Sequence, residues 1–212
     1  MSPFLLVLSS PSGGGKSTIA RHLLGAREDL GYSVSATTRA LRPGEQDGVD
    51  YHFLSPDEFA RRVDAGEFVE WAEYGGARYG TLKSEVERVL RSGRGVVLDI
   101  EVAGARQVRK AFPDSVQVFV LPPSGTVLAE RLRMRRTDDT AAQARRLAIA
   151  GEEIGAAPEY DYVIVNDDLR TAVGQVAAIL DAESRKVKRM SNLDETVARL
   201  RRELGMAVKS QQ

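Results

Sequence analysis

Short apolar runs recur along the chain at residues 4–8, 96–100, 116–121 and 162–165. Their residues are mostly β-branched or leucine, and each run is only four to six residues long. Such runs predict strands that are buried on both faces. We therefore expect a central sheet that other elements cover on each side.

Apolar residues at helical spacing occupy the intervals between these runs. Two helical faces are clear, the first of which stops at Gly93. They comprise Leu82, Val86, Val89 and Leu90, and further on Ala172, Val176, Ile179 and Leu180. Strands that alternate with helices predict a parallel α/β sheet, and such sheets bind ligands at the carboxyl ends of their strands.

Between about residues 33 and 81 the pattern changes to short alternating pieces at 32–36, 51–54 and 68–74. With turns at 42–44 and 75–76, this texture predicts an inserted, mostly antiparallel β subdomain. A helix interrupts it, because Ser55, Pro56 and Glu58 stand in the order of a capping serine, a first-turn proline and a capping-box glutamate. A second insert, at about residues 125–150, is predicted to be helical and is rich in arginine.

We therefore divide the chain into a core of residues 1–33, 82–124 and 151–190, a β insert of 34–81, a helical insert of 125–150 and a tail of 191–212. Residues 191–194 have the composition of a helix cap. The helix predicted after them has a narrow apolar stripe made of Leu193, Val197, Leu200 and Leu204. Packing on the core, pairing with another subunit and fraying are all open to this helix, so the oligomeric state is undecided.

Composition excludes several classes of function. The 212 residues include 30 Lys and Arg and 30 Asp and Glu, so there is no overall attraction for nucleic acid or an anionic membrane. The lack of cysteine excludes disulfides and thiolate metal sites and fits a reducing compartment. No stretch approaches the roughly 20 apolar residues that span a bilayer, and the run at 4–8 is too short for a signal peptide. We expect a cytoplasmic protein.

The first apolar run leads into a glycine-rich loop that matches the phosphate-binding P-loop pattern, except that Ser10 stands where the first glycine is usual. Its backbone N–H groups, and the N-terminus of the helix that follows, would surround phosphate oxygens. Lys16 would reach the β and γ phosphates, and Ser17 would coordinate Mg²⁺. An ordinary strand-to-helix turn gives no reason for a lysine there, where its charge opposes the helix dipole. The expected ATP contacts are Ser12, Gly13, Gly14, Gly15, Lys16, Ser17 and Thr18.

Two further sites follow from position and chemistry. Asp99 ends a predicted strand beside the P-loop, where P-loop enzymes keep an acid for Mg²⁺, bound directly or through water. Its alternative role is a helix cap. Arg39, Arg42 and Tyr51 gather around Pro-Gly turns, and guanidinium forks with a tyrosine hydroxyl suit a second phosphate. Solvated surface arginines are the alternative there.

The motifs of the chain, taken in order, resemble those of guanylate kinases. The likeness covers roughly residues 3 to 185, and several ordered motifs are far more specific than one. It is carried by segments 35–45, 47–53, 79–81, 98–105 and 165–169, by Glu70, and by the pairs Arg131-Leu132 and Arg146-Leu147. The resemblance implies a P-loop kinase with a parallel sheet flanked by helices, a β-rich nucleoside-monophosphate insert and a helical lid.

The same resemblance implies that the β insert binds GMP. Guanine offers N1–H and a 2-amino group as adjacent donors, so a single carboxylate such as Glu70 can accept both. Adenine presents a different edge and should be rejected. The implied contacts are Arg39, Arg42, Tyr51 and Tyr79 to the phosphate, Ser35, Glu70 and Thr81 to the guanine, and Glu101 to the purine. Glu101 stands where the family usually has Asp.

The resemblance makes the helical insert a lid over ATP, with Arg135 and Arg146 reaching the phosphates that are exchanged. Together with Lys16 and Arg39 they form the implied catalytic set. This chain has Arg136 where the family tends to have Gly. Asn166 would lie near the adenine, and a turn residue is its alternative role.

The expected reaction transfers the γ-phosphoryl group of Mg-ATP to GMP or dGMP, giving ADP and GDP or dGDP, a step of purine nucleotide metabolism. A non-catalytic binding module of the same fold is one alternative, which intact Lys16, Ser17 and Asp99 disfavour. A sugar-phosphate kinase of the same fold is another, and retention of the guanine-reading residues disfavours it. A GTPase is less favoured still, because the chain has no Asn-Lys-x-Asp motif.

Overall fold

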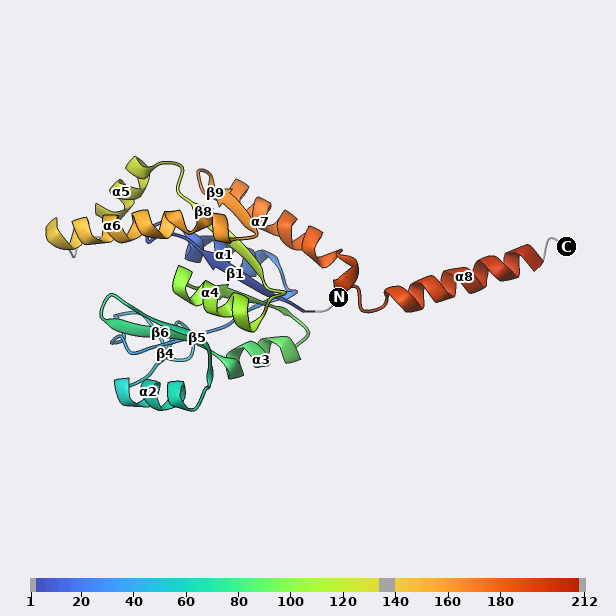
Figure 1. Cartoon of the computed structure of the whole chain (residues 1–212), viewed down its shortest axis with the longest axis horizontal. Coiled ribbons are helices and arrows are strands. Elements are labelled where there is room, and N and C mark those ends of the chain that lie inside the picture. The colour runs from blue at the N-terminus through green and yellow to red at the C-terminus, as the bar shows by residue number, and fades with distance from the viewer. Residues whose placement is uncertain (1–2, 134–139, 210–212) are drawn as a thin grey trace. The chain divides into compact units, whose positions relative to one another are not determined.

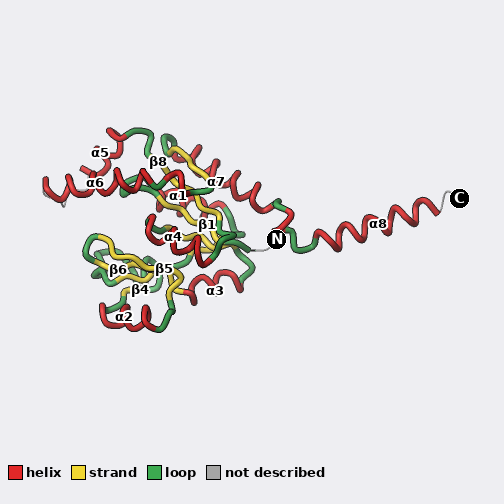
Figure 2. The backbone as a smooth tube through the Cα atoms, viewed as in Figure 1, coloured by secondary structure: helices red, strands yellow, loops and turns green. Residues whose placement is uncertain are grey.

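The structure is a computed structural model that describes residues 3–133 and 140–209. Its chain divides into two compact units, one of Pro3–Val176 and one that begins at Ala177. Each unit is considered by itself. The first holds two β-sheets and the helices around them, and Figure 1 and Figure 2 show these elements.

Five parallel strands form the central sheet of the first unit, in the order β2-β7-β1-β8-β9. The strands are β1 (Leu5–Ser9), β2 (Leu30–Tyr32), β7 (Gly95–Asp99), β8 (Val116–Leu121) and β9 (Tyr162–Val165). The parallel sheet that the apolar runs predict is confirmed. β1 lies in the middle, and Leu6, Val7 and Leu8 have no exposed surface. The P-loop therefore leaves the centre of the sheet.

One of the predicted strands is not buried on both faces. In β9, Ile164 is 5% exposed, whereas Val163 and Val165 are 47% and 48% exposed. β9 is the outermost strand of the sheet. An edge strand has fewer neighbours, and in β9 only the face of Ile164 is covered. The expectation of burial on both faces is wrong there.

Helices flank the central sheet. They are α1 (Lys16–Ala26), α3 (Lys83–Arg91), α4 (Val102–Ala111) and the first part of α7 (Leu169–Ser184). Val86 and Val89 of α3 belong to one buried cluster with Ala105 and Val108 of α4 and with residues of β1 and β7. The apolar face predicted to stop at Gly93 is therefore a core face, because its spacing places these valines on one side of the helix.

A second, four-stranded sheet has the order β4-β3-β6-β5. Its strands are β3 (Ser35–Thr37), β4 (His52–Phe53), β5 (Phe68–Tyr74) and β6 (Ala77–Leu82). β6 pairs antiparallel with β3 and β5, and only β3 and β4 are parallel. The mostly antiparallel β structure predicted for the insert is confirmed, and its boundaries as a subdomain stay a prediction. In the predicted piece 32–36, Tyr32 ends β2 of the central sheet and Ser35 begins β3, so the chain changes sheets within it.

Helices carry the remainder of the first unit. α2 (Pro56–Asp64) begins as its sequence predicts, since the Ser55 hydroxyl accepts a hydrogen bond of 3.1 Å from the backbone N–H of Glu58. The predicted helical insert contains α5 (Gly125–Arg133) and α6 (Thr140–Gly155). α6 continues past residue 150 and turns through Ala157–Glu159 into β9. Among the described residues, no helix has the length and apolar character needed to cross a bilayer.

The second unit contains the end of α7, a short 3-10 turn at Val187–Arg189, and α8 (Leu193–Lys209). Glu183 and Arg189 form an ion pair of 3.4 Å, with both side chains buried. The predicted stripe of α8 is solvent-accessible, because Val197, Leu200 and Leu204 are 44%, 46% and 68% exposed. The helix predicted in the tail is present. The three alternatives for it, packing on the core, pairing with another subunit and fraying, stay open.

Replacing the cap of α2 tests how strongly local sequence fixes this element. Ser55→Ala removes the acceptor for the Glu58 amide and should lower the free energy of unfolding by about 1 kcal/mol. Urea unfolding measures this, with Ser84→Ala on the exposed face of α3 as the control. Equal stability of the Ser55→Ala variant and the unaltered chain would show that the cap contributes nothing.

Candidate active site

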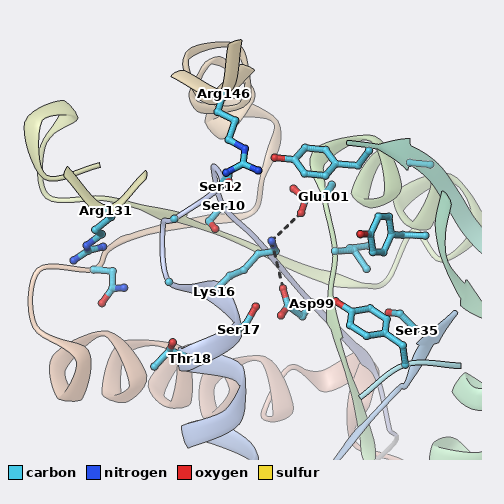
Figure 3. A pocket seen from close by; sticks show the side chains of 18 of the residues that line it. Ser10, Ser12, Lys16, Ser17, Thr18, Ser35, Asp99, Glu101, Arg131 and Arg146 are labelled. Carbon is cyan, nitrogen blue, oxygen red and sulfur yellow. Dashed lines mark hydrogen bonds and ion pairs between the residues drawn. The ribbon is translucent and has the colours of Figure 1, made fainter. Parts of the chain in front are cut away.

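A cleft of about 650 Å³ opens at the carboxyl ends of β1 and β7. Its walls come from elements far apart in sequence (Figure 3): the P-loop, the second sheet, α5 and α6. This is the edge at which a parallel α/β sheet is expected to bind ligands. The sequence-predicted residues that line it are Ser12, Gly13, Gly15, Lys16, Ser17, Thr18, Ser35, Arg42, Tyr51, Glu70, Tyr79, Asp99, Glu101, Arg146 and Asn166. Gly14 and Thr81 are not among the lining residues.

The P-loop has the backbone geometry that its glycines permit. Gly13 and Gly15 have φ of 83° and 99°, a region that residues with a side chain rarely adopt. α1 begins directly afterwards, at Lys16, so its N-terminus faces the cleft. Ser10 is accommodated by Gly14, since a Cβ at Gly14 would lie 2.8 Å from the Ser10 Cβ. Ser10, which stands where the usual P-loop pattern has glycine, therefore fits because position 14 has no side chain.

Asn166 ties this loop to the end of β9. Its side-chain Nδ2 donates to the backbone oxygen of Gly14 over 2.9 Å, and the residue is 7% exposed. A Cβ at Gly15 would overlap the same nitrogen. Asn166 thus contacts the P-loop backbone directly, while its implied place near the adenine stays a prediction.

Lys16 points between two carboxylates (Figure 3). Its Nζ lies 3.0 Å from Glu101 Oε1 and 3.6 Å from Asp99 Oδ1. Burial disfavours the charged amine, but Asp99 and Glu101 outweigh this effect and raise the pKa of Lys16 above its ordinary value. The ammonium group is therefore fully charged at neutral pH and is held at the mouth of the P-loop.

Asp99 and Ser17 offer the oxygen ligands that Mg²⁺ prefers. Asp99 is the last residue of β7, and its buried Oδ1 accepts no hydrogen bond from any residue that the structure describes. The side chain of Ser17, in the first turn of α1, also lines the cleft. Mg²⁺ bound with nucleotides usually has one or two protein oxygens and several water or phosphate ligands. The residues present fit such an ion.

Glu70 is a carboxylate buried inside the second sheet. It is 5% exposed, and the hydroxyl of Thr81, on the neighbouring strand, donates to its Oε1 over 2.6 Å. Burial raises the pKa of Glu70 to about 7, against the opposing effect of the hydrogen bonds from Thr81. Ser35 stands opposite Thr81 in the register of β3 and β6. The three predicted guanine-reading residues are therefore neighbours across three strands.

The residues predicted to hold the GMP phosphate take two positions. Arg42, Tyr51 and Tyr79 line the cleft, and the two tyrosine rings meet edge to face with centroids 6.0 Å apart. Arg39 does not line it. Its guanidinium lies 5.2 Å from the Tyr51 ring centroid and makes two hydrogen bonds, of 2.8 and 2.9 Å, to the Glu45 carboxylate.

The helical insert brings arginine to the opposite side of the cleft. Arg131 of α5 and Arg146 of α6 both line it, and Figure 3 shows Arg146 extending toward the P-loop. Arg135 and Arg136 lie outside the described residues. Glu153 of α6 also reaches the P-loop, where its Oε2 accepts a hydrogen bond of 3.1 Å from the backbone N–H of Ser12. Burial and the neighbouring Glu101 raise the pKa of Glu153 to about 7.

Comparison with known proteins shows the family of this chain. Residues 2–183 match the family described as guanylate kinase. The guanylate kinase of Symbiobacterium thermophilum is 51% identical over 194 residues, covering 91% of this chain and 92% of that protein. That of Carboxydothermus hydrogenoformans is 47% identical, covering 88% and 92%. The crystal structure of guanylate kinase from Anaplasma phagocytophilum superimposes with a TM-score of 0.75 at 37% identity, covering 92% and 93%.

The chain belongs to the guanylate kinase family. Sequence reasoning missed the contacts that Asn166 and Glu153 make with the P-loop. Asn166 follows a predicted strand, and this position is the one signal that could have placed it beside the loop. Glu153 follows Glu152 in a helical pattern, and nothing in the sequence separates the two.

The amide of Asn166 provides a test of how the P-loop is positioned. Asn166→Ala removes the hydrogen bond to Gly14 and should raise the KM for ATP about tenfold, since a buried carbonyl loses its partner. The KM for GMP should change little. Steady-state kinetics with each nucleotide varied in turn measure this, with exposed Asn192→Ala as the control. Unchanged ATP kinetics would contradict the positioning role.

The buried carboxylate of Glu70 should limit stability. Its pKa rises from 4.5 to about 7 on folding, so the unfolded chain loses this proton more readily and the carboxylate destabilises the fold as pH rises through this range. Glu70→Gln cannot ionise. It should raise the free energy of unfolding by about 1–3 kcal/mol at pH 8 and by much less at pH 4.5.

Urea unfolding at both pH values measures the effect of Glu70→Gln. The matched control is Glu73→Gln, on the same strand but exposed, which should change stability little at either pH. An equal gain at both pH values, or a loss at pH 8, would show that ionisation of Glu70 is not the cause.

Proposed function

We propose that this chain is an ATP-dependent guanylate kinase that transfers the γ-phosphoryl group of ATP to GMP or dGMP. The observation that carries this proposal is the meeting of two different sites in one cleft. A P-loop with a charged lysine lies on one side. A buried carboxylate with its hydroxyl donor, which suits the guanine edge, lies on the other.

The donor side binds phosphate through the P-loop amides and Lys16. Lys16 would exchange its bonds to Glu101 and Asp99 for the β and γ phosphates of ATP. Arg146, and Arg135 by resemblance, would cover the same phosphates from the helical insert. The proposed ATP contacts are Ser12, Gly13, Gly14, Gly15, Lys16, Ser17, Thr18 and Asn166.

The acceptor side holds GMP by both of its ends. Glu70 would accept hydrogen bonds from N1–H and the 2-amino group of guanine, with Ser35 and Thr81 beside it. Arg42, Tyr51 and Tyr79 would bind the phosphate, and Arg39, fixed by Glu45, would add positive charge nearby. Glu101 is proposed to contact the purine once Lys16 leaves it for the phosphates.

The chemical step needs no general base. An oxygen of the GMP phosphate is already ionised near neutral pH and attacks the γ-phosphorus of ATP. The bond from that phosphorus to the β–γ bridging oxygen breaks, and ADP leaves with the electron pair. The enzyme's work is to align two anions that repel each other and to neutralise charge in the transition state, for which Lys16 and the arginines on both sides are suited.

Mg²⁺ is the proposed ion at this site. Asp99 and Ser17 would hold Mg²⁺, directly or through water. Mg²⁺ held there would help to neutralise the charge of the ATP phosphates. GMP and ATP are the proposed partners, with no nucleic acid and no membrane, and the cytoplasm is the proposed location. Assignment as a monomer or a homo-oligomer is left to measurement.

ADP release tests the function. The purified chain, with Mg-ATP, should release ADP rapidly when GMP is the acceptor, and at most weakly with AMP, UMP, CMP or ribose phosphates. Release with a sugar phosphate instead would overturn the acceptor, and no release with any acceptor would favour a non-catalytic binding module.

Two substitutions separate the donor side from the acceptor side. Lys16→Ala should lower kcat at least about 100-fold and leave GMP binding nearly unchanged, because it removes charge stabilisation of the transferred group. Glu70→Ala should instead reduce discrimination between GMP and AMP more than it weakens ATP binding. Turnover assays and calorimetric titration with each nucleotide measure both. Unchanged discrimination in Glu70→Ala would show that another residue reads the base.

A further inference from the structure

Gly104 of α4 faces the carboxylate of Glu70. A Cβ built on Gly104 would overlap Glu70 Oε2 and would lie 2.9 Å from its Cδ. The three nearest heavy atoms to this Cβ all belong to the Glu70 side chain. Gly104 is itself buried within α4, and its φ does not lie in the left-handed region. The glycine therefore serves to leave space, since its backbone conformation does not require it.

The position of the Glu70 carboxylate is limited from two sides. Thr81 holds Oε1 through its hydroxyl, and the surface of α4 at Gly104 lies against Oε2. Any side chain at position 104 would take the place of this carboxylate oxygen. The end of a glutamate side chain rotates easily, so the expected response is displacement of the carboxylate rather than movement of α4 or of the strands.

We propose that Gly104 is a positioning residue for guanine specificity, because its missing side chain leaves room for Glu70 to face the cleft while bonded to Thr81. This inference rests on the proposed function. It extends specificity beyond the residues that contact the base, to a helix of the central core. The acceptor class that it serves is a purine monophosphate with a 2-amino group.

Helix propensity sharpens the test. Replacing a helical glycine by alanine ordinarily stabilises a helix, and Gly174→Ala provides this ordinary case, since a Cβ at Gly174 in α7 would meet no atom within 4 Å. Gly104→Ala makes the same chemical change at the site of the proposed contact. A difference between the two variants therefore reports the space beside Glu70 and not the loss of a glycine.

The experiment compares GMP with IMP, which lacks the 2-amino group, in the unaltered chain and both variants. In Gly104→Ala, kcat/KM for GMP should fall about 10- to 100-fold, mainly through KM, because Glu70 no longer meets both donors. The preference for GMP over IMP should fall about tenfold or more, and the KM for ATP should not change. Gly174→Ala should keep all three values.

Two further variants keep the test decisive if Gly104→Ala folds poorly. In a Glu70→Ala background, Gly104→Ala should fold, and it should leave the GMP-to-IMP ratio where Glu70→Ala alone puts it. In the Gly104→Ala background, the shorter carboxylate of Glu70→Asp should cost less than it costs in the unaltered chain. Additive effects in both pairs would overturn the proposal.

The outcomes separate this inference from the proposed function. Without GMP-dependent ADP release by the unaltered chain, the function is wrong and the inference fails with it. With that activity present, an unchanged GMP-to-IMP ratio in Gly104→Ala overturns the role of Gly104 alone.

Discussion

The donor side of the proposed active site depends on how the charge of Lys16 is held at the carboxyl edge of the central sheet. β1 and β7 are adjacent parallel strands, so the P-loop after one and Asp99 at the end of the other must meet. Lys16 pairs there with Asp99 and Glu101. Anions bound to the P-loop must take this ammonium group from the carboxylates. In the proposed function, the carboxylates that raise the pKa of Lys16 therefore also compete with the phosphates of ATP for its ammonium group.

The proposed acceptor side depends instead on a buried carboxylate, whose hydrogen-bond partner is the neutral hydroxyl of Thr81. Burial of Glu70 raises its pKa to about 7, which makes the carboxylate expensive to ionise in the folded chain. A ligand that supplies two hydrogen-bond donors offsets that cost, and a ligand without them leaves the carboxylate unsatisfied. In the proposed function, the second sheet thus gives up stability at Glu70 for discrimination between bases. At the edge of the central sheet, by contrast, opposite charges lie together, because Lys16 forms ion pairs with Asp99 and Glu101.

The sequence predicts the parts of this protein that local pattern determines. The apolar runs and the capping serine at Ser55 specify strands and a helix within a few residues, and family motifs indicate which side chains belong together. Pattern fails where position in the sheet matters, as for exposed Val163 and Val165 of the edge strand β9. It also fails where the chain changes sheets between Tyr32 and Ser35, because both pieces have the same alternating texture.

Contacts across the fold could not be predicted for a related reason. The hydrogen bond from Asn166 to Gly14 and the space that Gly104 leaves for Glu70 join residues far apart in the chain, and neither leaves a mark on local periodicity. Gly14 leaves room in the same way for Ser10. At Gly104 and at Gly14, the lack of a side chain leaves the space that the neighbouring side chain, of Glu70 or of Ser10, occupies. The proposed role of Gly104 would make guanine specificity depend on the space that a glycine leaves as well as on the polar side chains that line the cleft.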